Sequence, residues 1–228
     1  MDDSKRLRLI GVRAAAEVKH GDFVGLGTGS TAAAMLEALA ARVAEGLDVT
    51  GVATSESTKA ACERLGIRLV ELDDIDRLDL CIDGADEIDP QLNVVKGRGG
   101  ALLYEKLVAL RALRLIIIAN SGKLVDQLGT RLPLPVEVIP FGHLHTKVSI
   151  ENLGLDPTLR LNDDATPYVT DGGHYIYDCE TDGISNPAHL ALQLKSITGV
   201  VDHGLFVGMA HEAITIDEDG TITRHLPQ

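Results

Sequence analysis

Four carboxylates gather within seven residues directly after an apolar segment of the chain. They lie in residues 83–89, which read DGADEID, and the apolar run is residues 78–82. Carboxylates held close together repel one another and raise one another's proton affinity, which suits such groups to proton transfer. The pattern therefore predicts a site of acid–base chemistry at the end of a buried strand.

The four acids of this segment are not equivalent. We expect Asp83 and Asp86 to face a crevice, whereas Glu87 and Asp89 are solvated or support the next turn. The alternative is an ordinary solvated acidic turn. The acidic segment directly follows a predicted buried strand, and this makes a solvated turn less favoured.

A glycine-rich segment is the second candidate for chemistry. Residues 25–31 read GLGTGST and join a short apolar run to an alanine-rich helical pattern. Backbone amides, hydroxyls and a helix N-terminus in such a turn can hold a phosphate. A tight turn with glycines for close packing is the alternative. A dinucleotide-binding fingerprint is disfavoured because Ser30 occupies its last glycine position.

Two further segments carry lysines beside glycines. Residues 96–100 read KGRGG, and their glycines let the backbone approach a ligand while Lys96 supplies positive charge. Glu105 lies in the helix expected to follow, where an isolated glutamate is usually paired on the surface. Residues 120–123 read NSGK, and Lys123 either reaches an anion or is a solvated charge.

Apolar periodicity predicts the elements that position these segments. Strands are predicted at residues 23–26, 49–53, 67–71, 78–82 and 115–119, and helices at 7–19, 30–42, 59–65 and 101–113. Hydroxyls at residues 30–31 are expected to cap the second helix. Strands that alternate with helices predict an α/β fold with a doubly wound, mostly parallel, Rossmann-like sheet. Ligands bind outside the carboxyl ends of such strands, so the polar segments are expected to converge there.

Several prolines after residue 120 interrupt the alternation of strands and helices, and this change predicts a second domain. We predict a smaller α+β domain at residues 132–205, inserted into a large domain formed by residues 1–131 and 206–228. Its expected helices are residues 146–153 and 188–196, and its expected strands lie near Tyr168 and at residues 175–177. Residues 204–210 are expected to return the chain to the large sheet.

Composition excludes several classes of partner. The formal net charge is −13 and no basic block occurs, so nucleic acid is not expected as a partner. No apolar run has the length needed to cross a bilayer, so no membrane partner is expected. The three cysteines, Cys62, Cys81 and Cys179, are odd in number and lie in apolar contexts typical of reduced thiols. We therefore predict a cytoplasmic protein.

Histidines offer no recognised metal site. No acid or cysteine spacing around His143, His145 or His174 matches a known ligand set, so they are predicted to be hydrogen-bonded or solvated, with no metal. The residues by themselves thus favour a phosphorylated small molecule and carboxylates for proton transfer.

Several motifs in order resemble one enzyme family. Residues 25–32, 83–88 and 96–102, followed by Glu105 and Lys106, resemble the successive signatures of type A ribose-5-phosphate isomerase. The similarity continues through residues 135–141, 170–174 and 204–210, and so covers nearly the whole chain. The resemblance implies interconversion of D-ribose 5-phosphate and D-ribulose 5-phosphate in the non-oxidative pentose phosphate pathway. It also implies a homodimer or a dimer of dimers, without metal or organic cofactor.

The resemblance also implies residue roles. Glu105 matches the group that moves a proton between C2 and C1 through an enediolate, and the catalytic set is completed by Asp83, Asp86 and Lys96. We expect Asp83 to assist ring opening and Lys96 to stabilise oxyanion charge. The substrate-binding residues implied are Thr28, Gly29, Ser30, Thr31, Asp83, Gly84, Ala85, Asp86, Lys96, Gly97, Arg98, Gly99 and Lys123.

Two departures from the family pattern affect the phosphate contacts. Leu7 stands where some members carry a lysine that reaches the phosphate, and residues 120–123 begin with Asn where Asp is commoner. Phosphate affinity is therefore expected to be lower unless Lys5, Arg6 or Arg8 substitutes.

Two other functions compete with isomerisation. A sugar-phosphate sensor module shares this architecture, but no helix-turn-helix or basic segment precedes the domain in this sequence. A nicotinamide-dependent dehydrogenase rests only on the three glycines of residues 25–29, and the acidic ribose contact expected about 20 residues later is not convincing.

Overall fold

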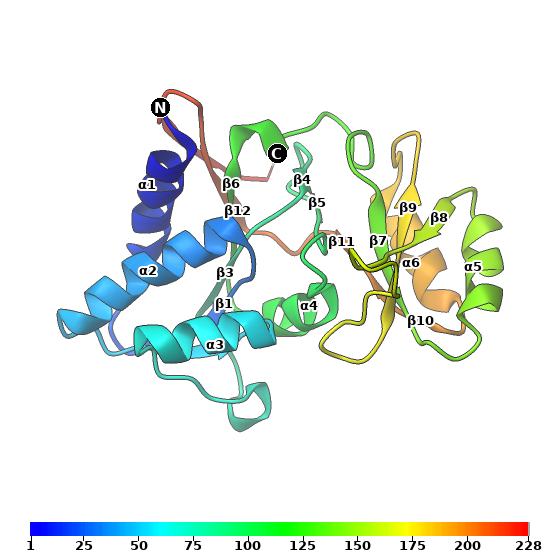
Figure 1. Cartoon of the computed structure of the whole chain (residues 1–228). Helices are drawn as coiled ribbons and strands as arrows, with labels where there is room; N and C mark the ends of the chain where they lie inside the picture. The colour runs from blue at the N-terminus through cyan, green and yellow to red at the C-terminus, as the bar shows by residue number, and fades with distance from the viewer. Residues whose placement is uncertain (228) are drawn as a thin grey trace. The chain divides into compact units, whose positions relative to one another are not determined.

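The computed structural model describes residues 1–227, and the chain divides into two compact units (Figure 1). The first unit comprises Met1–Ala85, Tyr104–Lys123 and the described residues from Met209 onward. The second comprises Asp86–Leu103 and Leu124–Gly208. Each is described by itself below.

The first unit is built on a six-stranded sheet. Its strands are β1 (Phe23–Leu26), β2 (Thr50–Ala53), β3 (Leu80–Asp83), β6 (Leu115–Asn120), β12 (Glu212–Ile216) and β13 (Ile222–His225). They are ordered β13-β12-β6-β3-β1-β2, and every neighbouring pair is parallel except β12 with β13. The predicted mostly parallel α/β sheet is confirmed.

Helices cover both faces of this sheet. They are α1 (Asp3–Ala15), α2 (Ser30–Ala44), α3 (Glu56–Leu65) and α4 (Leu102–Leu110), with a short 3-10 turn, η1 (Leu72–Asp74). Alternate strand residues such as Leu26, Ile82 and Ile118 share a core with α1 and α2. Because successive strand residues point to opposite faces, Gly25 faces the other way, and a Cβ there would lie 2.7 Å from Cγ1 of Val108 in α4. The sheet is therefore doubly wound.

The second unit carries two smaller sheets. The first contains β7 (Leu134–Val138), β8 (Asp156–Leu159), β9 (Tyr175–Glu180) and β10 (Val200–His203), ordered β10-β7-β9-β8 with antiparallel pairing throughout. The second contains β4 (Glu87–Ile88), β5 (Val94–Val95) and β11 (Leu205–Phe206). The helices α5 (His143–Glu151) and α6 (Pro187–Ser196) complete this α+β unit.

Two predicted strands and one predicted sheet assignment are wrong. Residues 67–71 form no strand, because only Leu69 bridges to Gly51. Tyr168 lies in no strand, since its neighbour Pro167 makes an isolated bridge. Residues 204–210 do not return to the large sheet, because β11 within them pairs with β5. The strand that returns to the large sheet is β12, a few residues later.

The division into units also differs from the predicted domain limits. Residues 86–103, placed in the large domain by the prediction, group with the second unit, because β4 pairs with β5 and β5 pairs with β11. Residues 124–131 group with it as well, since Val125 donates its amide to Ile88 at 2.9 Å. That the chain has two independently folding domains with limits at residues 131 and 205 stays a prediction.

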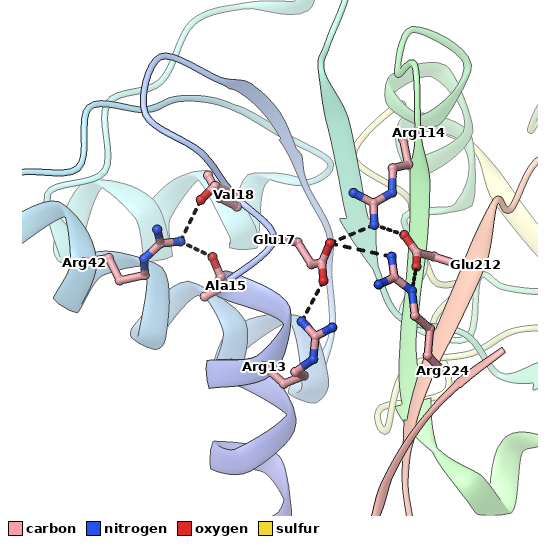
Figure 2. A network of polar contacts seen from close by, with 8 residues as sticks. All are labelled: Arg13, Ala15, Glu17, Val18, Arg42, Arg114, Glu212 and Arg224. Atoms are coloured by element: carbon pink, nitrogen blue, oxygen red, sulfur yellow. Dashed lines mark hydrogen bonds and ion pairs between the residues drawn. The ribbon is translucent and has the colours of Figure 1, made fainter. Parts of the chain in front are cut away.

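An ion-pair network fixes the end of α1 in the first unit (Figure 2). Glu17 pairs with Arg13 and Arg114 at 2.7 Å each and with Arg224 at 3.8 Å. Glu212, whose side chain is only 2% exposed, also pairs with Arg114 and Arg224. Burial raises the pKa of Glu17, but hydrogen bonds from Arg13 and Arg114 outweigh it, so the pKa of this carboxyl lies below its usual value.

This lowered pKa predicts a pH-dependent contribution to stability. Glu17 binds fewer protons in the folded state than in the unfolded state, so its stabilisation is complete above its unfolded pKa and is lost as the pH falls through the folded one. We expect Glu17→Gln to lower the free energy of unfolding at pH 7 by about 1–2 kcal/mol. The difference from the wild type should shrink below about pH 4.5. Urea unfolding over this pH range measures it.

The exposed Glu45 provides the control for that measurement. Glu45→Gln should change the free energy of unfolding by less than about 0.5 kcal/mol at every pH. A Glu17→Gln deficit that stays constant from pH 7 to pH 3 would contradict the linkage.

Candidate active site

The glycine-rich turn leaves the start of α2 open. Gly29 is the N-cap residue, with φ 105°, and no side chain of the described residues caps the helix, so the predicted capping by a residue 30–31 hydroxyl is wrong. Ser30 is exposed and Thr31 is half-buried at this end. The first amides of a helix have no intrahelical acceptor, and an anion can accept hydrogen bonds from them.

The hydroxyl of Thr28 lies at the centre of a cluster of hydroxyls. Its Oγ1 is 2.8 Å from Oγ1 of Thr54, 2.8 Å from Oγ of Ser55 and 3.0 Å from Oγ1 of Thr58. These three residues follow β2, between a strand predicted at residues 49–53 and a helix predicted at 59–65, and no sequence motif singled them out. The cluster fixes the side chain of Thr28 and with it the backbone of the glycine turn.

Asp83 is the last residue of β3 and is 1% exposed. Its Oδ1 accepts hydrogen bonds from the amides of Thr28 at 3.1 Å and Gly84 at 2.7 Å. A Cβ on Gly27 would lie 2.2 Å from that same oxygen, so the turn needs glycine at this position. The glycine-rich turn and the carboxylate of Asp83 therefore hold each other in place.

Glu105 lies on the same face of the sheet as Asp83. The segment after α4 pairs with the amino end of β3, through Leu113 N to Leu78 O at 2.9 Å, so the start of α4 points toward the carboxyl ends of the strands. Val108 packs on Gly25, and Glu105 lies one turn earlier on that helix face. Its side chain is 4% exposed. Asp83 lies two residues after Cys81 in β3. Because alternate strand residues share a face, it also points to the face that α4 covers.

The loop after β6 brings a lysine to the same edge. Residues Ser121–Lys123 form the short 3-10 turn η2, and Lys123 is half-buried. Oδ1 of Asn120 is buried, and no described residue donates a hydrogen bond to it. The edge of the first unit therefore carries Thr28, Gly29, Ser30, Thr31, Asp83, Gly84, Ala85, Glu105 and Lys123 of the predicted set.

The rest of the predicted set belongs to the second unit. Lys96 is 3% exposed, its amide donates to Gly204 O at 2.9 Å, and its Nζ lies 5.6 Å from the centre of the Phe206 ring. Asp86 accepts a hydrogen bond from the amide of Arg98 at 3.0 Å. Gly97 has φ 105°, a conformation that disfavours other residues. Arg98 and Gly99 are exposed.

The remaining acids of the acidic segment are structural. Glu87 is 1% exposed and accepts hydrogen bonds from the amides of Gly129, Arg131 and Leu132 at 2.5, 2.8 and 3.0 Å. Asp89 accepts from the amide of Asn93 at 2.8 Å. A supporting role is confirmed for both, and the solvated alternative is wrong.

Histidines and cysteines also take structural positions. His174 lies 3.0 Å from the buried Glu137, and His143 lies 2.8 Å from the hydroxyl of Tyr177, so the predicted hydrogen bonds are confirmed for these two. All three cysteines are buried and none is in a disulfide, and burial raises the pKa of Cys62 to about 11. Among residues 1–227 no group of His, Cys, Asp and Glu could hold a metal ion. No helix in that range has the length and apolarity to span a membrane.

Residues 50–220 match the family model for ribose 5-phosphate isomerase A (phosphoriboisomerase A). The chain is 50% identical over 229 residues to ribose-5-phosphate isomerase A of Rhodopseudomonas palustris (strain TIE-1), with 98% of each chain covered. It is 52% identical over 226 residues to the protein of the same name from Synechococcus sp. (strain JA-3-3Ab), again with 98% of each covered.

Solved structures agree with these sequence matches. A D-ribose-5-phosphate isomerase in complex with phospho-erythronic acid superposes with a TM-score of 0.95 at 32% identity, covering 99% of this chain and all of the other. The Plasmodium falciparum ribose 5-phosphate isomerase gives 0.94 at 35% identity, covering 97% and 98%. The chain belongs to the ribose 5-phosphate isomerase A family.

Proposed function

We propose that this chain is an aldose-ketose isomerase that interconverts D-ribose 5-phosphate and D-ribulose 5-phosphate. Family membership over nearly the whole chain supports the substrate. The observation that carries the chemistry is the pair of buried carboxylates, Asp83 and Glu105, on one face of the sheet at its carboxyl edge.

The reaction requires a proton to move between adjacent carbons. In the open-chain aldose the C2 proton is acidic because the carbonyl lies at C1. Glu105 takes that proton and an enediolate forms. The same carboxyl then returns the proton to C1, while O1 gains a proton and the O2 hydroxyl loses one to become the ketone oxygen. Asp83, whose Oδ1 is fixed by two amides, serves as acid or base in ring opening and in proton exchange at the oxygens.

The open N-terminus of α2 suits the phosphate. The amides there, with Ser30 and Thr31, supply donors, and the helix dipole favours an anion. Lys123 adds positive charge. A groove of about 750 Å³ between α1 and α2 is lined by Leu7, Arg8 and Ser30. Since Arg6 pairs with Asp3 at 2.9 Å, we assign the role of the missing lysine at position 7 to Arg8.

Residues of the second unit complete the proposed set. We assign Lys96, with the amides of Gly97, Arg98 and Gly99, to the negative charge that develops on the substrate oxygens. Asp86 holds the amide of Arg98 and so supports the conformation of this segment. We also propose that the enzyme acts without metal or cofactor, in the cytoplasm and the pentose phosphate pathway, as a homodimer or dimer of dimers.

The test is turnover by the purified chain. With ribose 5-phosphate in excess chelator and no added cofactor, ribulose 5-phosphate should form far above the uncatalysed rate. Binding of the sugar phosphate without turnover would instead support the sensor alternative, and turnover only after metal addition would contradict cofactor independence.

A further inference from the structure

The segment at residues 96–100 is held by a side chain far away in the sequence. Arg160 follows β8, and its Nη1 donates hydrogen bonds to the carbonyls of Gly97 at 3.0 Å and Arg98 at 3.1 Å. No motif in the sequence pointed to this arginine, which lies 63 residues from Gly97.

A carboxylate fixes the guanidinium in turn. Nε of Arg160 donates to Oδ2 of Asp178 at 2.8 Å, and Nη2 donates to Oδ1 at 2.5 Å. The side chain of Arg160 is 14% exposed and that of Asp178 is 26% exposed. A bidentate pair of this kind sets the plane of the guanidinium, and Nη1 is left to the two carbonyls.

An aromatic ring covers the far end of the same segment. The ring of Tyr168 lies 5.8 Å from the Arg160 guanidinium carbon, and a Cβ on Gly100 would lie 2.1 Å from the Tyr168 hydroxyl. The amide of Tyr168 also donates to the carbonyl of Arg160 at 2.9 Å. Backbone and ring together thus join Arg160 to both ends of the glycine segment.

We propose that Arg160 and Asp178 are positioning residues for isomerisation, which hold the backbone of residues 97–98 so that Lys96 and the neighbouring amides meet the charge on the substrate. The inference rests on the role proposed above for Lys96. Glycines allow this segment many backbone conformations, and Arg98 and Gly99 are exposed. The hydrogen bonds from Arg160 to two carbonyls, and from the Arg98 amide to Asp86, explain why it keeps one shape.

The role predicts a specific kinetic pattern. Arg160→Met should lower kcat/KM by about 10²-fold, mainly through kcat, because a displacement of about 1 Å in a catalytic group has effects of this size. Asp178→Asn should act in the same direction. Inhibition by inorganic phosphate should stay within about twofold of the wild type. Phospho-erythronic acid, which carries a carboxylate as well as a phosphate, should bind at least tenfold more weakly.

Two comparisons separate positioning from general damage to the fold. Lys147→Met removes an exposed ion pair of the same unit, Lys147 with Glu151 at 3.4 Å, and should leave kcat unchanged. Arg160→Lys keeps the charge, but one ammonium cannot serve both carboxylate oxygens and both carbonyls. It should therefore lose about tenfold in kcat while its urea unfolding midpoint stays near that of the wild type, which covers the case in which Arg160→Met does not fold.

A double mutant decides whether Arg160 acts through Lys96. If it does, the double variant Lys96→Met/Arg160→Met should lose much less activity than the product of the two single losses, and the neighbouring amides account for any further loss. The positioning role would be overturned if the double variant showed the full product of the two single losses. It would also be overturned if Arg160→Met and Asp178→Asn kept kcat/KM within twofold of the wild type. Either result would leave the role of Lys96 in place. A fully active Lys96→Met would instead remove Lys96 from the proposed function, and the positioning role with it.

Discussion

Glu105→Gln should reduce kcat by about 10³-fold or more and change KM by no more than a few-fold. Glutamine keeps the shape of the side chain but cannot accept the C2 proton, and a general base acts on the transition state rather than on substrate binding. The buried position of Glu105, at 4% exposure, leaves little room for water to replace it as the base. Steady-state kinetics with ribose 5-phosphate measure the effect.

Isotope exchange makes this prediction more specific. Substrate carrying deuterium at C2 should show a primary isotope effect with the wild type, and Glu105→Gln should no longer exchange that position with solvent. Glu87→Gln is the matched control, because Glu87 is equally buried but binds three backbone amides. It should lower stability and leave kcat nearly unchanged. Near-normal turnover by Glu105→Gln would transfer the base to Asp83 or Asp86.

The large sheet was predictable because its strands carry strong local signals. The run before Asn120 is apolar and β-branched, and the parallel pairing of β3 with β6 follows from the helix between them. The strand β12 was missed, because the apolar run at residues 204–210 was expected to return to the large sheet in its place. The small sheet was harder to predict, because prolines lie within its strands. Pro157 lies in the edge strand β8, and Pro135 lies in β7, which has neighbours on both sides. Proline in an apolar run normally argues against a strand.

The site was predictable only in its outline. Parallel strands place their following loops at one edge, so the convergence of the glycine turn with Asp83 followed from topology. The side chains that hold those loops in place could not be predicted from the topology. Three hydroxyls around Thr28 come from a segment 26 to 30 residues away, and Arg160 reaches back 62 to 63 residues to two carbonyls. Neither contact has a local sequence pattern, because both depend on how distant segments pack.

Gly27 connects the two parts of the site in the first unit. An ideal Cβ there would lie 2.2 Å from Oδ1, 2.5 Å from Cγ and 2.6 Å from Cα of Asp83, and contacts under 3 Å require something to move. The amide of Gly27 also donates to the carbonyl of Ile82 at 3.0 Å, so the turn cannot move away without losing a hydrogen bond next to Asp83. A single methyl group therefore has to displace the carboxylate, the strand end or the phosphate turn.

Gly27→Ala should accordingly lower kcat/KM by about 10²-fold or more and reduce the free energy of unfolding by about 1–3 kcal/mol. Gly11→Ala provides the matched control, because its Cβ would lie 2.4 Å from the carbonyl oxygen of Ala34 between α1 and α2, far along the chain from Asp83. It should lose similar stability in urea unfolding but keep kcat in the folded protein. Equal loss of activity in both variants would mean that the overlap at Gly27 acts through stability alone. A fully active and stable Gly27→Ala would show that Asp83 does not need its present position, because the carboxylate would then have moved without consequence for turnover.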